Sequence, residues 1–115
     1  IVPLLVGDAS PSEVADVLEA LWGGDETLVV ISSDLSHYHD YDTARRLDAA
    51  TTDAIEHFDG ASIGPNDACG YHGVRGLLQV AAEKGLRELT LDVRNSGETA
   101  GPRDQVVGYG SYLFY

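Results

Sequence analysis

The sequence predicts an α/β fold built on a mixed, mostly parallel sheet that is flanked by helices. Two uncharged runs rich in β-branched and other apolar residues, 1–6 and 27–31, are typical of buried strands. Segments with apolar residues at helical spacing follow these runs. Chains in which strands and helices alternate usually form a largely parallel sheet, because a helix carries the chain back between neighbouring strands.

Three amphipathic helices are expected from the spacing of their apolar residues. They cover residues 11–22, 40–57 and 71–84. Ser10 and Glu13 stand at the two positions of a capping box, and Pro11 suits the first turn. Glycine closes the first and third helices, at residues 23–24 and at Gly85.

The remaining segments complete one domain. Residues 58–68 contain glycine, proline and asparagine, which is typical of a loop. Residues 88–93 alternate between apolar and polar types and predict a half-buried strand, and a glycine-rich loop at 95–102 leads into a β-rich stretch at 106–115. No repeat or change of composition divides the chain, so we expect residues 1–115 to form a single domain.

Charge and cysteine content limit the surroundings in which the chain works. The chain has 7 Lys and Arg against 19 Asp and Glu, a formal net charge of −12. We expect neither nucleic acid nor an anionic membrane as a partner, because both would repel such a surface. The lone Cys69 has no internal disulfide partner, which favours a reducing, cytoplasmic location. Methionine is absent even at position 1, so we expect the chain to be a piece of a longer protein.

Polar residues gather where the predicted strand at 27–31 ends. Residues 32–40 (SSDLSHYHD) bring hydroxyls, carboxylates and two imidazoles to a strand's carboxyl end, where ligands bind in open α/β sheets. Asp34 stands three residues before His37, and a carboxylate beside an imidazole fixes its tautomer and raises its basicity. The pair therefore suits a general base or a metal ligand. The alternative is that Ser33 or Asp34 caps the next helix while His37 is merely exposed.

A second pattern in the same segment indicates a metallohydrolase. His37 and His39 share one face of an extended segment and could chelate one metal ion. The metallo-β-lactamase pattern His-x-His-x-Asp-His, however, meets Tyr41 and Asp42 at its last two positions. We therefore keep the metallohydrolase as the weaker hypothesis.

Two further segments offer donors for a site. Cys69 directly precedes the third predicted helix, whose positive end stabilises a thiolate, the form that binds soft metals. A lone cysteine is more commonly a buried small hydrophobe. Asn95 and Ser96 directly follow a predicted strand and would share a sheet edge with Ser33 and Asp34 if the two strands run parallel. An ordinary turn is the alternative for this loop.

Taken together, these segments resemble the MEMO family, also called AmmeMemoRadiSam system protein B. The segments that carry the resemblance are residues 31–37 (ISSDLSH), 67–70 (DACG), 95–101 (NSGETAG) and 106–110 (VVGYG). Their order and spacing agree across nearly all 115 residues. The resemblance implies that the chain is the C-terminal portion of a MEMO-like domain. It also implies a fold like that of the class II (LigB-like) extradiol dioxygenases, which we expect to be incomplete in this chain.

The resemblance assigns roles to residues of the site. In the extradiol enzymes a non-haem Fe(II) binds a catecholic substrate and O₂ beside a catalytic histidine. Carried over by motif, His37 is the acid/base and a residue of the metal pocket, Asp34 is its neighbour, and Cys69 is a thiolate ligand. The residues expected to line the pocket are Ser33, Asn95 and Ser96. The implied cofactor is iron as Fe²⁺, with copper as the alternative.

The family also has a feature that this chain lacks. Its members carry an N-terminal half that adds two histidine ligands to the pocket, and no segment here matches them. We therefore expect an incomplete metal site and an exposed apolar edge that promotes self-association. The leading hypothesis is redox or ring-opening chemistry on a small aromatic ligand. The alternative is a non-catalytic module that binds a peptide or a protein partner through the same pocket.

Overall fold

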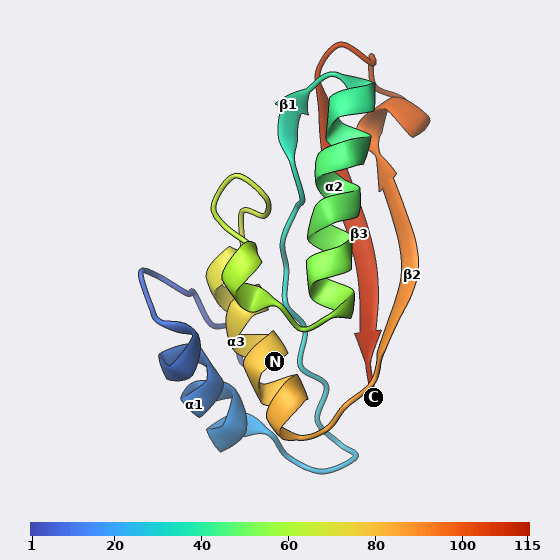
Figure 1. Cartoon of the computed structure of the whole chain (residues 1–115). Helices are drawn as coiled ribbons and strands as arrows, with labels where there is room; N and C mark the ends of the chain where they lie inside the picture. The colour runs from blue at the N-terminus through green and yellow to red at the C-terminus, as the bar shows by residue number, and fades with distance from the viewer.

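Three helices and a three-stranded sheet form the α/β fold (Figure 1). The computed structural model describes all of residues 1–115. The helices are α1 (Pro11–Leu21), α2 (Tyr41–Glu56) and α3 (Tyr71–Glu83). The strands are β1 (His37–His39), β2 (Glu88–Asn95) and β3 (Val106–Phe114), with short 3-10 turns η1 (Gly60–Ser62) and η2 (Ser96–Glu98). The three predicted helices and the last two predicted strands are confirmed.

The helix ends follow local signals in the sequence. The Ser10 hydroxyl accepts the Glu13 N–H at 3.2 Å and the Glu13 carboxylate accepts the Ser10 N–H at 2.8 Å, which is the predicted capping box. α1 packs on α3, where Gly76 lies directly against Val14. A side chain at position 76 would collide with Val14, so glycine sets the close approach of the two helices.

The sheet differs from the prediction in strand direction. Its order is β1-β3-β2, and both pairings are antiparallel. The central strand β3 pairs with β2 from Glu88↔Phe114 to Asn95↔Gly108, whereas β1 adds only a short ladder that begins at His37↔Val107. The prediction of a mostly parallel sheet was therefore wrong. Only a short connection joins β2 to β3, and such connections produce antiparallel neighbours.

The two predicted strands at residues 1–6 and 27–31 do not join the sheet. None of the backbone groups of residues 1–6 or 28–33 forms a backbone hydrogen bond. Their apolar side chains are largely exposed, including Leu28 at 82% and Val30 at 75%. An apolar β-branched run shows that a segment favours extended backbone and burial, but a strand also needs a neighbour to pair with. These two segments have no such neighbour within the structure.

The buried face of α2 is more polar than its sequence suggests. Its buried residues are Ala44, Asp48, Thr51, Thr52, Ala54 and Ile55. The sequence pattern placed Leu47 and Ala50 on this face, but Ala50 is exposed. The polar residues are tolerated because each forms a hydrogen bond: Thr52 bonds the Tyr112 hydroxyl of β3 at 2.7 Å, and Thr51 bonds the Leu47 carbonyl of its own helix at 3.1 Å.

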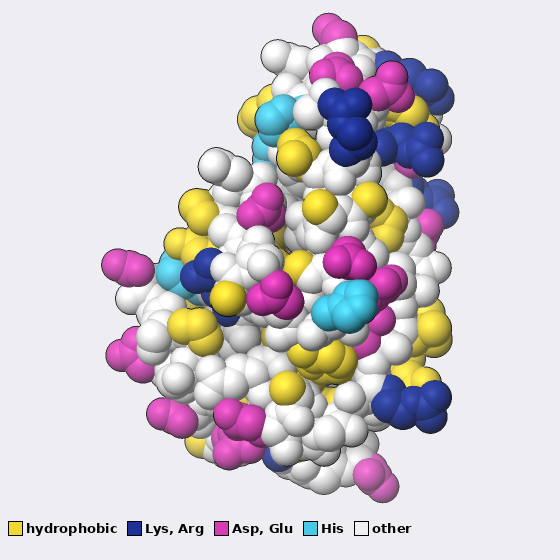
Figure 2. Space-filling model, in the orientation of Figure 1, with side chains coloured by type: hydrophobic (Ala, Val, Ile, Leu, Met, Phe, Trp, Pro, Cys, Tyr) yellow, Lys and Arg dark blue, Asp and Glu magenta, His cyan; other side chains and the backbone are white.

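The surface reflects the acidic composition. Figure 2 shows Lys and Arg side chains gathered mainly near the upper end of α2 and β2, with acidic side chains spread over much of the rest of this face. No helix is both long and apolar enough to span a membrane.

Candidate metal centre

The segment that leads into β1 is fixed from two sides. The Leu35 N–H donates to the Gly108 carbonyl at 2.9 Å, and the Gly108 N–H donates to the Ser36 carbonyl at 2.8 Å. On the other side, the Ser36 N–H donates to the carboxylate of Asp48 in α2 at 2.9 Å. Leu35 and Ser36 are buried. Asp34 and His37, which flank them, are therefore held at defined positions at the surface of the fold.

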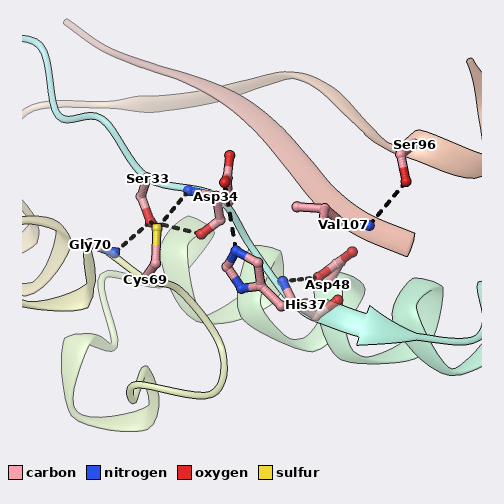
Figure 3. Close-up of polar contacts among 9 residues, drawn as sticks. Ser33, Asp34, His37, Asp48, Cys69, Gly70, Ser96 and Val107 are labelled. Atoms are coloured by element: carbon pink, nitrogen blue, oxygen red, sulfur yellow. Dashed lines mark hydrogen bonds and ion pairs between the residues drawn. The ribbon is translucent and has the colours of Figure 1, made fainter. Parts of the chain in front are cut away.

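A second loop brings Cys69 to this segment. Cys69 stands directly before Gly70, the N-cap of α3, and is an exposed, free cysteine rather than a buried one. The Asp34 N–H donates to the Cys69 sulfur at 3.2 Å, and the Cys69 N–H donates to the Asp34 carbonyl at 3.2 Å. The Gly70 N–H donates to the Ser33 hydroxyl at 2.9 Å. Figure 3 shows the Asp34 N–H bond to the sulfur and the Gly70 N–H bond to the Ser33 hydroxyl, which join the two loops.

Three potential ligands meet where the loops join. One ligand atom each from Asp34, His37 and Cys69 can be chosen so that all lie within 4.8 Å of one another. In a tetrahedral site with bonds of about 2.0–2.3 Å the donors lie about 3.3–3.8 Å apart, so rotation of the side chains that brings the donors closer by up to about 1 Å would let all three bind one metal. The donors are a carboxylate, an imidazole and a sulfur, and the cluster is accessible to solvent. The residues present therefore fit a metal ion with room for further ligands.

The contact between the two residues of the Asp-x-x-His pair is electrostatic. His37 Nε2 lies 3.6 Å from Asp34 Oδ2, which is too long for a strong hydrogen bond. Their side chains are 33% and 47% exposed, so both remain within reach of a ligand. The structure thus brings together the predicted residues Ser33, Asp34, His37 and Cys69.

Asn95 and Ser96 serve a different part of the fold. Asn95 is buried, and its side-chain oxygen accepts the Gly97 N–H at 2.9 Å at the start of η2. The Ser96 hydroxyl accepts the Val107 N–H at 3.1 Å, away from the Cys69 cluster in Figure 3. No hydrogen bond or ion pair links either residue to Asp34. The shared parallel edge on which their placement depended does not form.

The other histidines near the motifs are outside the cluster. His39 is exposed at the end of β1, and the three-donor group contains His37 without it. Tyr38, between the two histidines, has a positive φ of 63°, so the extended backbone assumed for a His-x-His pair is interrupted there. His72 instead contacts the N-terminal segment, through a 2.8 Å hydrogen bond to the Ala9 carbonyl.

Asp48 is a residue that the sequence analysis missed. It is only 2% exposed, and it anchors Ser36 between the two donors Asp34 and His37. Its carboxylate lies so close to Gly108 that any side chain at position 108 would collide with it. Its position in the sequence could have revealed that it is buried, because residues 44, 48, 51 and 55 follow the helical spacing of one buried face.

An apolar groove begins beside the cluster. It has a volume of about 450 Å³ and lies between residues 27–35 and the C-terminal half of β3. Ser33 and Leu35 line it on one side, and Tyr112 lines it on the other. The groove therefore connects the surroundings of the donor cluster with the unpaired segment at 28–33.

Comparison with known proteins agrees with the motifs. The sequence model described as Memo-like protein matches residues 1–113. MEMO1 family proteins of Thermotoga maritima and Thermoplasma acidophilum are 33% and 31% identical over 100% and 97% of the chain. A MEMO1 family protein of Desulfurococcus amylolyticus is 29% identical over 100% of it. Each alignment covers 44% of the relative, so the chain spans less than half the length of these relatives. The chain belongs to the Memo-like protein family.

Proposed function

We propose that this chain forms one side of a mononuclear non-haem metal site that serves redox chemistry. The observation that carries the proposal is the convergence of Asp34, His37 and Cys69 within 4.8 Å. Thiolate and imidazole ligands favour iron, copper or zinc over magnesium or calcium. The family resemblance implies Fe²⁺ first and copper second. When bound, such a metal would supply electron transfer to a substrate or to O₂.

The protein residues have separate tasks in this proposal. Cys69 supplies a sulfur ligand. His37 Nε2 faces the Asp34 carboxylate, which holds the ring by its charge at 3.6 Å. That nitrogen either binds the metal or exchanges a proton with a substrate, because one lone pair cannot do both. Asp34 either supplies a carboxylate oxygen as a third ligand or orients His37.

The apolar groove supports a small aromatic substrate. Its 450 Å³ volume is in the range of pockets that hold small organic ligands, and its lining is mainly hydrophobic. Because Ser33 lines the groove and also contacts Cys69, an aromatic ring in the groove would lie beside the cluster. The ring-opening chemistry of the extradiol enzymes would use this arrangement of metal and substrate.

The experiment is an anaerobic calorimetric titration of the chain with Fe²⁺, Cu⁺ and Zn²⁺. Cys69→Ser and His37→Gln should each weaken Fe²⁺ or Cu⁺ binding by at least about tenfold. Losing a residue that only hydrogen-bonds to a ligand already weakens metal binding by about this factor, so losing a ligand should weaken it at least as much. The matched control is His39→Gln, which alters an exposed histidine of the same strand outside the cluster. Equal affinity in the wild type and Cys69→Ser would contradict the ligand assignment. Binding of Zn²⁺ alone would contradict the redox role.

A second candidate function is binding of an extended peptide. It is favoured by the unpaired backbone of residues 28–33, which borders the apolar groove. An added strand would gain main-chain hydrogen bonds there and place alternate side chains in the groove. In that case Cys69→Ser would weaken metal binding without changing peptide affinity, whereas Val30→Pro would weaken peptide binding alone.

A further inference from the structure

The hydroxyl of Ser33 occupies the centre of the contact between the two loops. It accepts the Gly70 N–H at 2.9 Å and donates to the Asp34 carbonyl at 2.8 Å. The Cys69 sulfur lies 3.8 Å from the same oxygen (Figure 3). One side chain on the first loop therefore contacts Cys69 and the residue that follows it on the second loop.

These bonds determine where the sulfur lies. Cys69 is exposed at the turn before α3, between buried Ala68 and half-buried Gly70, and the hydrogen bonds that join its sulfur and Gly70 to the other loop come from Asp34 and Ser33. Without the Ser33 hydroxyl, the Gly70 N–H would lose its acceptor and the turn could move away from Asp34. A ligand that is displaced by even 1 Å no longer fits a bond of about 2.3 Å to a shared metal ion.

The close approach of the turn depends on Gly70. A side chain at position 70 would put its Cβ 2.8 Å from the Ser32 carbonyl and 2.9 Å from the Ser33 Cβ. Real Cβ contacts are longer, so the turn would have to shift. The absence of a side chain at position 70 therefore lets the Gly70 N–H reach the Ser33 hydroxyl. Together, Ser33 and Gly70 hold the turn that carries Cys69 against the first loop.

The Ser33 hydroxyl also has a second direction available to it. A hydroxyl hydrogen rotates to suit its surroundings. The Asp34 carbonyl keeps another donor, the Cys69 N–H at 3.2 Å, if the hydroxyl turns away. The hydroxyl can therefore turn toward the sulfur and join the Asp34 N–H as a second donor to it. Hydrogen bonds to a ligating sulfur adjust the electronic properties of the metal site.

We propose that Ser33 is the positioning residue of the Cys69 ligand. It fixes the turn that carries Cys69 and supplies a hydroxyl donor to the sulfur when a metal is bound. The inference rests on the proposed function, since it assumes that Cys69 binds the metal. It adds Ser33 as a hydrogen-bond partner of one of the three donors. It also predicts a shift in the absorption of the sulfur–metal bond, which a loss of fold stability alone would not produce.

The test is a Co²⁺ titration of the chain, followed by the sulfur-to-cobalt charge-transfer absorption. Ser33→Ala should bind Co²⁺ about 10- to 100-fold more weakly and shift this absorption, which is the usual effect of losing an outer-shell partner. Ser33→Thr keeps the hydroxyl and should restore both properties. Ser32→Ala is the matched control, because Ser32 is exposed and its side chain forms no hydrogen bond.

The outcomes separate this inference from the proposed function. If the wild type lacks a sulfur-to-cobalt absorption, the Cys69 ligand and this inference both fail. If the wild type shows the absorption and Cys69→Ser loses it, the ligand stands. Unchanged affinity and absorption in Ser33→Ala would then overturn the positioning role alone. Should Ser33→Ala fail to fold by circular dichroism, folded Gly70→Ala decides, and wild-type affinity and absorption in it would overturn the proposal.

Discussion

The backbone of Asp34 is joined to Cys69 by two hydrogen bonds, one to its sulfur and one from its backbone N–H, each 3.2 Å long. The Asp34 N–H donates to the Cys69 sulfur, and the Cys69 N–H donates to the Asp34 carbonyl. Residues 35 positions apart in the sequence are thereby held side by side. The candidate metal centre depends on this connection, because His37 follows Asp34 on the same segment.

Asp48 should be important for stability although it is not one of the donors. Asp48→Ala removes the acceptor of the buried Ser36 N–H, which costs about 1–3 kcal/mol when no replacement is found. Asp48→Asn keeps a carbonyl oxygen and should cost less. The free energy of unfolding from urea denaturation measures both. Asp53→Ala, an exposed change on the same helix, should shift it by no more than about 1 kcal/mol. An Asp48→Ala variant as stable as Asp53→Ala would contradict the anchoring role.

Glu98 should make part of the stability dependent on pH. Its carboxylate accepts the Asn95 N–H and the Tyr41 hydroxyl, each at 2.9 Å, and these bonds lower the pKa of Glu98. Because the folded-state pKa lies below that of the unfolded chain, the stabilisation is complete above the unfolded pKa. This stabilisation is lost as the pH falls through the pKa that Glu98 has in the folded state.

The variant Glu98→Gln tests this dependence. Its urea midpoint should fall less steeply than that of the wild type between pH 7 and pH 3. Glu83→Gln, on the exposed face of α3, serves as the control and should keep the wild-type slope. Parallel curves for the wild type and Glu98→Gln would show that these two hydrogen bonds do not stabilise the ionised form.

The unpaired segment at 28–33 should cause self-association. Its backbone groups form no backbone hydrogen bonds, and two of its own apolar side chains, Leu28 and Val30, are exposed. Exposed strand-like edges of this kind pair with other chains unless charge prevents it. Sedimentation velocity should show oligomers that grow with concentration, and Val30→Lys should reduce them. Ala20→Lys, which adds the same charge at an exposed position of α1 away from any strand edge, is the control. A monomeric wild type at all concentrations would contradict this expectation.

The helices could be predicted because their signals are local. Ser10 and Glu13 lie three residues apart and form the capping box regardless of the rest of the fold. The sheet could not be predicted in this way. Residues 27–31 have the composition of a strand, but their pairing depends on a neighbour that composition does not specify. The direction of β2 relative to β3 likewise follows from their short connection rather than from their own residues.

The candidate site shows the same division. Asp34 and His37 could be found from one short segment, whereas Cys69 was connected to them by the family resemblance. The structure then placed its sulfur against the Asp34 N–H. The grouping of Asn95 with them assumed a parallel edge that does not form. Asp48 was missed because periodicity locates a buried face but does not reveal that a carboxylate on it has a partner.

The central claim is that Cys69 is a ligand of a metal held together with Asp34 and His37. The chain contains one cysteine and no methionine, so Cys69 carries the only sulfur in these 115 residues. X-ray absorption of the Fe²⁺-loaded chain in sulfur-free buffer should therefore show one sulfur scatterer about 2.3 Å from the metal. It should be absent from Cys69→Ser. A wild-type spectrum with only oxygen and nitrogen scatterers would contradict the account.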